Sequence, residues 1–362
     1  MRYLQLCLLC AFFMAPLNAG NGPSSGGSDG DDVHNPPAVV LGISNFLFET
    51  TMRYDPEQAG LSLGEQKADQ HTYMQIQTVV DHVPHLHRLA GPVFQAILAM
   101  RGAFSEKAPH HELQLFGVQG AHNTFTKGWL EEAGIVWKGQ SKEGLTGCCF
   151  TFLHDDASHF LVYPGVSCDI DLNHLSSTLN QDNIKVCFLS GFLLQKDAPF
   201  GRDALLRLLG EKLPRDKIVF FLPDNNFMRQ NGEDFFKETL KNAAHVAGRL
   251  EDIASLFSFA RPTLDQIQDF ANENNLTFRL TAKEKGAYTI APQMQKPYHH
   301  KPLKVQNPPK KPLGRLEPMR ASTAFAGAYE AGRLQGDNLE KCGKMGLNAA
   351  LNTAMPSRNI LN

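Results

Sequence analysis

Short apolar runs alternate with helical patterns along most of this 362-residue chain. The runs end in glycine or a polar residue and are typical of strands buried on both faces. The segments between them repeat apolar positions at the spacing of a helix face. This order predicts an α/β fold with a doubly wound, mostly parallel sheet, in which ligands bind at the carboxyl ends of the strands. The expected strands are residues 38–42, 113–117, 185–191, 217–222 and 277–280, and the expected helices are residues 125–133, 234–247 and 324–334.

The segment at residues 145–163 has a different pattern. Its apolar and polar residues alternate, and Asp155 and Asp156 interrupt the alternation. A period of two is typical of a strand with one polar face, and adjacent acidic residues favour a turn. We therefore expect an antiparallel hairpin in this segment.

The N-terminal region contains two segments that differ in composition. Arg2 precedes an apolar run at residues 4–17, and small or polar residues follow it. This order is typical of a secretory signal, and the run is short for a membrane span. We expect residues 1–19 to be a signal-like segment and the protein to be exported, either periplasmic or secreted; the alternative is an attached N-terminal helix on a cytoplasmic protein. Residues 20–37 are rich in Gly, Ser, Pro and Asp, which predicts a flexible linker before a domain at residues 38–362.

The overall composition limits the possible partners. The formal net charge is −2 and the Lys and Arg residues are dispersed, which argues against a nucleic-acid partner or an anionic membrane surface. No second apolar stretch reaches membrane length, so we expect no membrane contact after processing. The seven cysteines include Cys7 and Cys10, and the remaining ones show no zinc or redox spacing. We expect them to be small core residues.

Histidines can form a metal site only when their spacing brings them to one face of the chain. His82, His85 and His87 lie close together, but Pro84 interrupts the run and no two of them share a helical face. We expect no metal site there. The pairs at residues 110–111 and 299–300 are expected to lie on the surface.

Several short motifs occur in order along residues 39–355. A strand and turn end at Glu49, residues 90–96 contain Gly91, and residues 317–327 contain Thr323 at the start of a helix with small residues. Together with residues 116–120, 146–148 and 188–192, this order resembles the ribokinase-like (PfkB) family of carbohydrate and nucleoside kinases, and its adenosine-kinase branch most. The resemblance implies a ribokinase-like fold with a small β lid formed by residues 49–75 and 137–163.

The resemblance places the catalytic positions before the last helix pattern. The catalytic Asp of the family aligns with Thr323, and its glycine-rich anion hole aligns with Arg320, Ala321 and Ser322. An alkyl hydroxyl is too weakly acidic to serve as a general base near neutral pH. The N–H groups of residues 321–323 are expected at the start of the helix, where anions bind. Arg320 either binds an anion with its own guanidinium or fills the phosphate site.

The resemblance also implies a substrate side. Glu49 stands where the family has an Asp that holds substrate hydroxyls, and Gln95 stands where it has an Asn. Asn45 and Gly91 complete the substrate-binding positions. A sugar or a nucleoside is the implied ligand.

Four further residues align with the nucleotide and magnesium side. Arg249 and Asp252 replace an Asn and a Glu that organise magnesium in the family. Lys283 replaces the first glycine of a nucleotide-side turn, and Gly286 keeps the later one. ATP and Mg²⁺ are the implied cofactors if the protein is active.

Two functions follow from these substitutions. Because the base, the anion hole and the magnesium side are all altered, we expect absent or weak phosphotransfer. The first function is a pseudokinase that keeps a sugar- or nucleoside-sized pocket or acts through an unknown protein partner. The second is a divergent ATP-dependent kinase that phosphorylates a sugar or nucleoside hydroxyl, with Glu317 or Asp337 supplying the carboxylate if the motif is displaced by a few residues. A homodimer formed through the lids is compatible with either.

Overall fold

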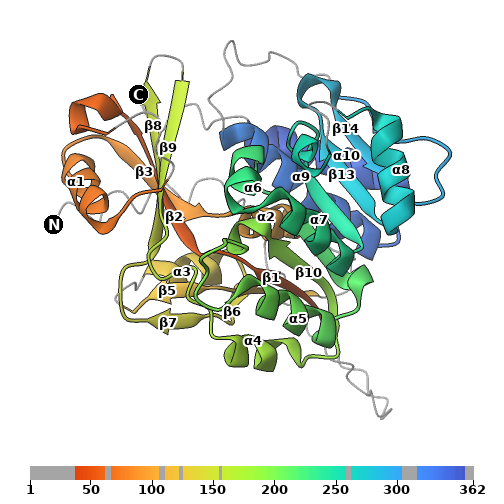
Figure 1. Cartoon of the computed structure of the whole chain (residues 1–362), viewed down its shortest axis with the longest axis horizontal. Helices are drawn as coiled ribbons and strands as arrows, with labels where there is room; N and C mark the ends of the chain where they lie inside the picture. Colours follow the sequence, from red (N-terminus) through yellow and green to blue (C-terminus); the bar gives the residue numbers. More distant parts are fainter. Residues whose placement is uncertain are drawn as a thin grey trace, which may run out of the picture. The chain divides into compact units, whose positions relative to one another are not determined.

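A nine-stranded sheet lies at the centre of the chain (Figure 1). The computed structural model describes residues 37–61, 67–105, 111–121, 125–154, 157–257, 262–303 and 316–354. The signal-like segment at residues 1–19 and nearly all of the linker at residues 20–37 lie outside these described residues. Everything described below belongs to the unit that begins at Pro37.

The strand order in the large sheet is β15-β14-β13-β12-β11-β10-β1-β4-β6. All neighbours from β13 to β6 are parallel, and only β14 and β15 are antiparallel to their neighbours. This topology confirms the predicted doubly wound, mostly parallel sheet. The strands are β1 (Ala38–Ile43), β4 (His111–Phe116), β6 (Ile135–Trp137), β10 (Ile184–Ser190), β11 (Ile218–Phe221), β12 (His245–Arg249), β13 (Thr277–Thr281), β14 (Ala287–Ile290) and β15 (Tyr298–His300).

Helices cover both faces of the large sheet because its strands are apolar on both sides. In β1, Leu41 and Ile43 belong to one hydrophobic cluster and Val40 to the other, as alternation along a strand requires. Helices α4 to α8 pack in the first cluster, and α2, α3, α9 and α10 pack in the second. The helices are α2 (Pro92–Ala103), α3 (Phe125–Glu132), α4 (Leu172–Leu179), α5 (Arg202–Lys212), α6 (Asn225–Asn231), α7 (Glu233–Thr239), α8 (Leu264–Asn274), α9 (Leu316–Leu334) and α10 (Leu339–Ala354).

A four-stranded sheet with the order β3-β2-β8-β9 forms the lid. Helix α1 (Gln70–Val80) covers one of its faces, where Met52, Ile76 and Phe150 form a separate hydrophobic cluster. The β8–β9 pair is antiparallel, which confirms the predicted hairpin. The lid strands are β2 (Leu47–Arg53), β3 (His85–Ala90), β8 (Gly147–His154) and β9 (Ala157–Tyr163).

The lid differs in extent from the segments expected in the sequence. Strand β3 belongs to it, although residues 85–90 were not assigned to the lid. Residues 137–142 do not, because β6 joins the large sheet and β7 (Gln140–Lys142) pairs with β5 (Val118–Gly120). The register explains the first difference, since β3 pairs with β2 along its whole length.

Two predicted helix boundaries were wrong. Residues 234–247 do not form one helix: α7 ends at Thr239 and β12 begins at His245. The small apolar residues at 243–247 satisfy a helical and an extended pattern equally, and pairing with β11 and β13 decides for the strand. The helix expected at residues 324–334 begins earlier, at Leu316.

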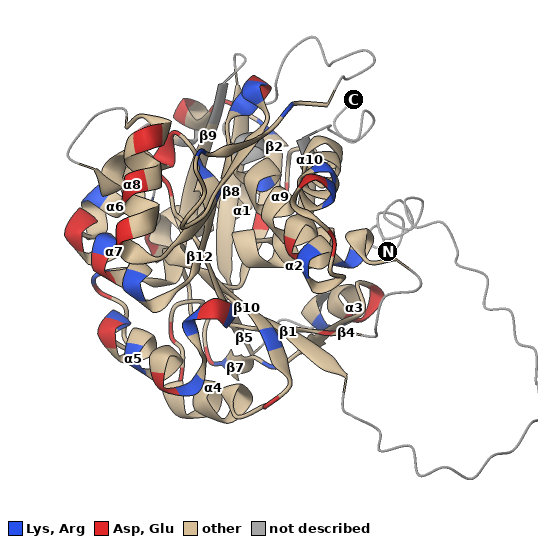
Figure 2. Cartoon of the chain, turned by 90° about the vertical axis from the view of Figure 1, so that its right-hand side faces the viewer, with Lys and Arg blue, Asp and Glu red and all other residues tan. Residues whose placement is uncertain are grey.

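Short 3-10 helices occupy several connections between these elements, and none of the described helices is long and apolar enough to cross a membrane. In Figure 2, basic and acidic residues occur together on the helices α5 and α7, in agreement with the dispersed charges of the sequence. The 3-10 helices are η2 (Pro56–Ala59), η3 (Gly191–Leu193), η4 (Arg215–Lys217), η5 (Leu240–Asn242), η6 (Asp252–Leu256) and η7 (Lys283–Lys285).

The polar and sulfur-containing residues of the core show one confirmation and one error. Cys148, Cys149, Cys168, Cys187 and Cys342 are buried and free, as predicted. The prediction that residues 299–300 form a surface pair is wrong for His300, which is 5% exposed and shares a hydrogen bond of 2.9 Å with Thr289. Gly343 makes room for the ring, because a Cβ atom there would lie 1.8 Å from His300 Nδ1.

Candidate functional site

Glu49 lies on β2 at the inner side of the lid and is only 3% exposed. Its cross-strand neighbour Arg88 donates to it twice, from Nη2 to Oε1 at 3.1 Å and from Nε to Oε2 at 3.2 Å. The hydroxyls of Thr51 and Thr151 donate to Oε1 at 3.1 and 3.2 Å. This side of the lid sheet is opposite to the face that packs on α1, because side chains alternate along β2.

Arg320 reaches the same carboxylate from helix α9. Its Nη2 donates to Glu49 Oε2, and the Arg320 side chain is 14% exposed. Burial lowers the pKa of Arg320 to about 10, so the guanidinium remains cationic at neutral pH. We call Arg88, Glu49 and Arg320 the lid cluster. A carboxylate has about four lone-pair positions, and five donors from Arg88, Arg320 and the two threonines share those of Glu49.

The start of α9 decides the state of the aligned anion hole. The helix begins at Leu316, so Arg320 is already inside it. Only about the first four N–H groups of a helix lack an internal partner, and residues 320–323 lie beyond these. The expectation that residues 321–323 present N–H groups at a helix start is therefore wrong.

Helix propensity gives the physical reason for the early start. Arg and Ala are among the best helix formers, whereas each Gly in a helix costs about 1 kcal/mol relative to Ala. The sequence has Arg320 and Ser322 where the resemblance implies glycines, so the helix extends toward its N-terminus instead of breaking there.

Thr323, which aligns with the catalytic base of the family, also uses its hydroxyl within the helix. Thr323 is 3% exposed, and its Oγ1 donates to the carbonyl oxygen of Arg320 at 3.0 Å. The Ser322 hydroxyl donates to the carbonyl oxygen of Met319 at 2.8 Å. Both hydroxyls thus donate their hydrogen bonds to backbone carbonyl oxygens of α9.

Of the two alternative carboxylates, Asp337 lies far from Thr323. Asp337 follows the C-terminal end of α9, about 20 Å along the helix axis from Arg320. It pairs with Lys341 at 2.6 Å. The side chain of Glu317 is not among those described. Glu49 is the carboxylate that contacts this part of α9.

The expected substrate positions Asn45 and Gly91 lie together at the end of β1. Asn45 is 5% exposed, and its Nδ2 donates to the carbonyl oxygen of Phe192 and to Cys168 Sγ, both at 3.2 Å. Gly91 has a φ of 105°, and a Cβ atom there would lie 3.2 Å from the carbonyl oxygen of Asn45. Gln95 is half-buried in α2. The sequence patterns had not indicated Cys168 as a neighbour of Asn45.

The nucleotide-side positions form a separate charged cluster at the end of β12. Arg249 Nη2 donates to Asp252 Oδ1 at 2.6 Å, and Arg249 Nη1 lies 2.9 Å from Glu251 Oε1. Lys283 Nζ lies 2.6 Å from Glu251 Oε2. Although burial acts to lower it, the partner Asp252 raises the pKa of Arg249. Glu251, which joins Arg249 to Lys283, was not predicted as a site residue.

Backbone conformation supports the alignment of the turn at Lys283. Lys283 has a φ of 51°, in the left-handed region that favours glycine. Gly286 has a φ of 90°, and a Cβ atom there would lie 2.2 Å from the carbonyl oxygen of His300. The second glycine is therefore required by packing, while Lys283 tolerates a strained conformation.

The nucleotide-side residues do not fit a magnesium ion. The carboxylates of Glu251 and Asp252 are already paired with Arg249 and Lys283. Magnesium requires free oxygen ligands in a near-octahedral arrangement. No group of three or more His, Cys, Asp or Glu side chains in the described residues is placed to hold a metal ion.

A second carboxylate between two arginines lies further along α9. Glu330 is completely buried and pairs with Arg279 from β13 and, at 2.5 Å, with Arg333 from the next turn. His245 Nδ1 lies 3.2 Å from Arg279 Nη2. Burial acts to raise the pKa of Glu330, but the positive charges of Arg279 and Arg333 outweigh it and lower that pKa. We call Arg279, Glu330 and Arg333 the helix cluster.

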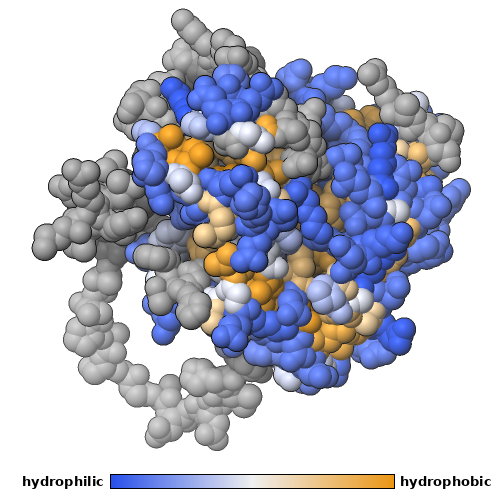
Figure 3. All heavy atoms as spheres, turned by 60° about the vertical axis from the view of Figure 1, so that its left-hand side comes forward, coloured by the Kyte–Doolittle hydropathy of each residue, from blue (hydrophilic) through white to orange (hydrophobic). Residues whose placement is uncertain are grey.

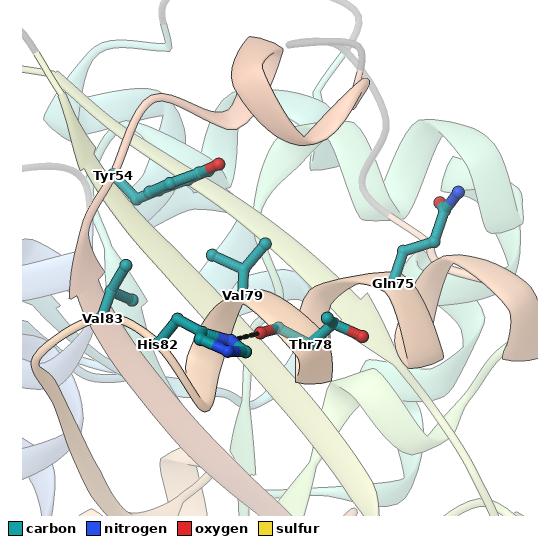
Figure 4. Close-up of a pocket in the computed structure, with 6 residues that line it drawn as sticks. All are labelled: Tyr54, Gln75, Thr78, Val79, His82 and Val83. Carbon is teal, nitrogen blue, oxygen red and sulfur yellow. Dashed lines mark hydrogen bonds between the residues drawn. The ribbon is translucent and has the colours of Figure 1, made fainter.

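A hollow of about 430 Å³ lies on the α1 side of the lid, away from the face that carries Glu49 (Figure 4). The His82 ring at its edge contacts the carbonyl oxygen of Thr78 at 2.7 Å. In Figure 3, apolar areas on this side are separated by hydrophilic residues. The hollow is lined by Tyr54, Gln75, Thr78, Val79, His82 and Val83.

Solved structures with a similar fold include a probable sugar kinase and adenosine kinases. A probable sugar kinase from Rhizobium etli superposes with a TM-score of 0.69 and 16% identity over 86% of this chain and 92% of that chain. Adenosine kinase from Sinorhizobium meliloti gives 0.69 and 15% over 87% and 93%, and Schistosoma mansoni adenosine kinase with adenosine and AMP gives 0.70 and 15% over 89% and 97%. No family model and no curated protein sequence matches this chain. The comparisons establish a ribokinase-like fold.

Proposed function

We propose that this protein is a degenerate relative of the PfkB sugar and adenosine kinases that binds a ligand but does not transfer phosphate. The ion pair between Glu49 and Arg320 carries this proposal. It closes the lid onto α9 at the place where the resemblance puts the substrate hydroxyl and the phosphoryl group. A hydroxyl ligand would have to displace Arg320 or another donor to reach Glu49.

Three further observations support the absence of phosphotransfer. Thr323 offers no base, and loss of a positioned base typically reduces a rate by about 10²–10⁴-fold. The backbone N–H groups at 320–323 are used within α9. The nucleotide-side carboxylates are neutralised by Arg249 and Lys283, so they leave no ligand set for magnesium. All three losses affect the same reaction, the transfer of phosphate from ATP.

The retained features favour a small ligand or a partner. Asn45 and Gly91 lie at the carboxyl end of β1, and ligands of doubly wound sheets bind at this edge. A sugar or nucleoside is the proposed ligand, and an unknown protein partner is the alternative. A protein that needs no ATP is compatible with the export that residues 1–19 predict.

A divergent active kinase is the second candidate, and one contact favours it. Glu49 forms an ion pair with Arg320. Opening of the lid would break this pair and free the carboxylate close to the part of α9 that carries Thr323. It would then have to act as the base in place of Thr323. Its five hydrogen bonds in the closed arrangement argue against this, because each must be exchanged first.

Thermal unfolding with and without ligands tests the proposal. We expect adenosine, ribose or fructose to raise the midpoint, since a ligand at 100 times its dissociation constant stabilises by about 2.7 kcal/mol. ATP with magnesium should leave the midpoint unchanged, and no ADP should form with any of the three. Turnover that disappears in Glu49→Gln would show that the second candidate is correct.

A further inference from the structure

Arg320 uses its hydrogen-bonding capacity only in part. A guanidinium carries several N–H donors arranged as a planar fork. Within the described part of the chain, Arg320 makes a single polar side-chain contact, from Nη2 to Glu49. The reason lies in Glu49, because Arg88 already pairs with both of its oxygens. Arg320 is therefore the incompletely satisfied arginine of the lid cluster.

The unused donors of Arg320 remain accessible. The side chain is 14% exposed, and its Nε and Nη1 atoms are not among the fully buried atoms without a partner. Arg279 in the helix cluster differs, since its Nε is fully buried without a hydrogen bond in the described chain. A cation that is largely desolvated and still accessible attracts an anion more strongly than one in water.

We propose that Arg320 anchors a binding site for a phosphate monoester, such as a sugar phosphate or a nucleoside monophosphate. The guanidinium fork matches two oxygens of such a group, and charge-assisted hydrogen bonds of this kind are among the strongest in proteins. The proposal rests on the proposed function and names its ligand class: the bound molecule already carries the phosphate that the protein does not transfer.

The position of Arg320 agrees with this assignment. It contacts Glu49 on β2, the strand that follows β1, and the sugar part of the ligand is proposed to lie toward Asn45 and Gly91 at the carboxyl end of β1. Arg88 pairs with the same carboxylate and adds a second positive charge beside Arg320. Because phosphate has three terminal oxygens, it can contact Arg320 while Glu49 keeps its bonds to Arg88.

Isothermal titration of the full-length protein tests the site with matched ligands. The probes are ribose 5-phosphate, ribose, gluconate and inorganic phosphate, at equal ionic strength. We expect ribose 5-phosphate to bind at least about tenfold more tightly than ribose, the scale of one charge-assisted contact. Tighter binding of gluconate than of ribose 5-phosphate would assign the fork to carboxylates and overturn the proposal.

Three variants identify the residue. Arg320→Gln should abolish the preference for the phosphorylated sugar, and Arg320→Lys should keep only part of it because it loses the fork. Arg202→Gln is the matched control, since Arg202 on α5 is half-buried and donates to the carbonyl oxygen of Asn231 on α6 at 2.6 Å. If Arg320→Gln fails to fold, Arg320→Lys and the wild-type preference decide. A preference that survives in Arg320→Lys at full size contradicts the proposal.

The outcomes separate this proposal from the proposed function. Equal affinity for ribose and ribose 5-phosphate, without turnover, would contradict the phosphate site. The proposal of a binding protein without kinase activity would then still hold. Formation of ribose 5-phosphate or AMP from ATP would overturn the proposed function, whatever the affinities are.

Discussion

Helix α9 takes part in two clusters of the same composition with different surroundings. In each, one glutamate lies between two arginines. The helix cluster joins α9 to β13 of the large sheet, and Glu330 is 0% exposed. The lid cluster joins α9 to the lid, and Arg320 keeps accessible donors. The chemical groups are the same in both, so their access to solvent and the elements they connect determine whether a cluster serves structure or binding.

The largest effect is expected from Glu330→Gln in the helix cluster. Removing one partner of a buried ion pair leaves Arg279 charged without compensation, which should lower the free energy of unfolding by about 3–5 kcal/mol. Urea unfolding followed by circular dichroism measures it. Glu340→Gln on the exposed side of α10 is the control and should change stability by less than about 0.5 kcal/mol. A loss below about 1 kcal/mol for Glu330→Gln would remove the contrast between the clusters.

Acid should lower the free energy of unfolding because of two buried histidines, His245 beside the helix cluster and His300. Burial lowers the pKa of His245 to about 3 and that of His300 to about 4, below the ordinary value near 6.5. Between pH 6.5 and about 4 the unfolded chain therefore binds protons that the folded chain does not, and stability falls as the pH falls. The expected slope is up to about 1.4 kcal/mol per pH unit for each histidine.

Urea unfolding at a series of pH values from 7.5 to 4.5 measures this slope. His245→Asn should reduce the slope, whatever it does to the stability at neutral pH, because residue 245 then no longer titrates. An unchanged slope in this variant would mean that His245 is protonated in the folded protein, in conflict with its contact to Arg279.

Glu49→Gln in the lid cluster should have a smaller effect on stability. Arg88 is 36% exposed and Arg320 retains access to water, so a loss of about 1–2 kcal/mol is expected. The same change should tighten the binding of ribose 5-phosphate several-fold, because the guanidinium of Arg320 no longer pairs with a carboxylate. Urea unfolding and calorimetric titration measure the two quantities. A stability loss as large as that of Glu330→Gln, without a gain in affinity, would make both clusters structural.

Arg333→Gln should have the smallest effect. Its side chain is 38% exposed, so water replaces part of its interaction with Glu330, and a loss below about 1 kcal/mol is expected. The measurement is again urea unfolding, repeated in 0.5 M salt, where the difference from wild type should shrink. A loss of several kcal/mol would show that both arginines of the helix cluster are needed to stabilise Glu330.

The strands of the large sheet could be predicted because their residues are apolar on both sides. Runs such as residues 185–191 and 217–222 have few polar positions, and burial between two helical layers requires this. The boundary between α7 and β12 could not be predicted, because Ala243, Val246 and Ala247 suit either structure until a neighbouring strand pairs with them.

The candidate site could be predicted only as separate positions. The resemblance indicated Glu49 and Arg320, but they are 271 residues apart, and no local pattern states that they pair. Arg88 had no signal of its own, since its importance comes from the register that places it opposite Glu49. The fate of the aligned anion hole depended on where α9 begins, which is a balance of helix propensity and packing.

The sequence by itself determined five strands of the large sheet, its doubly wound arrangement, the hairpin of the lid and the buried cysteines. These features follow from side-chain polarity and backbone period within about ten residues. Only the tertiary structure decided that Arg320 contacts Glu49 and that His300 is buried. It also decided that the lid cluster is accessible to solvent while the helix cluster, with the same composition, is buried. Ion pairs and burial depend on which distant segments meet, and this is set by the packing of the whole chain.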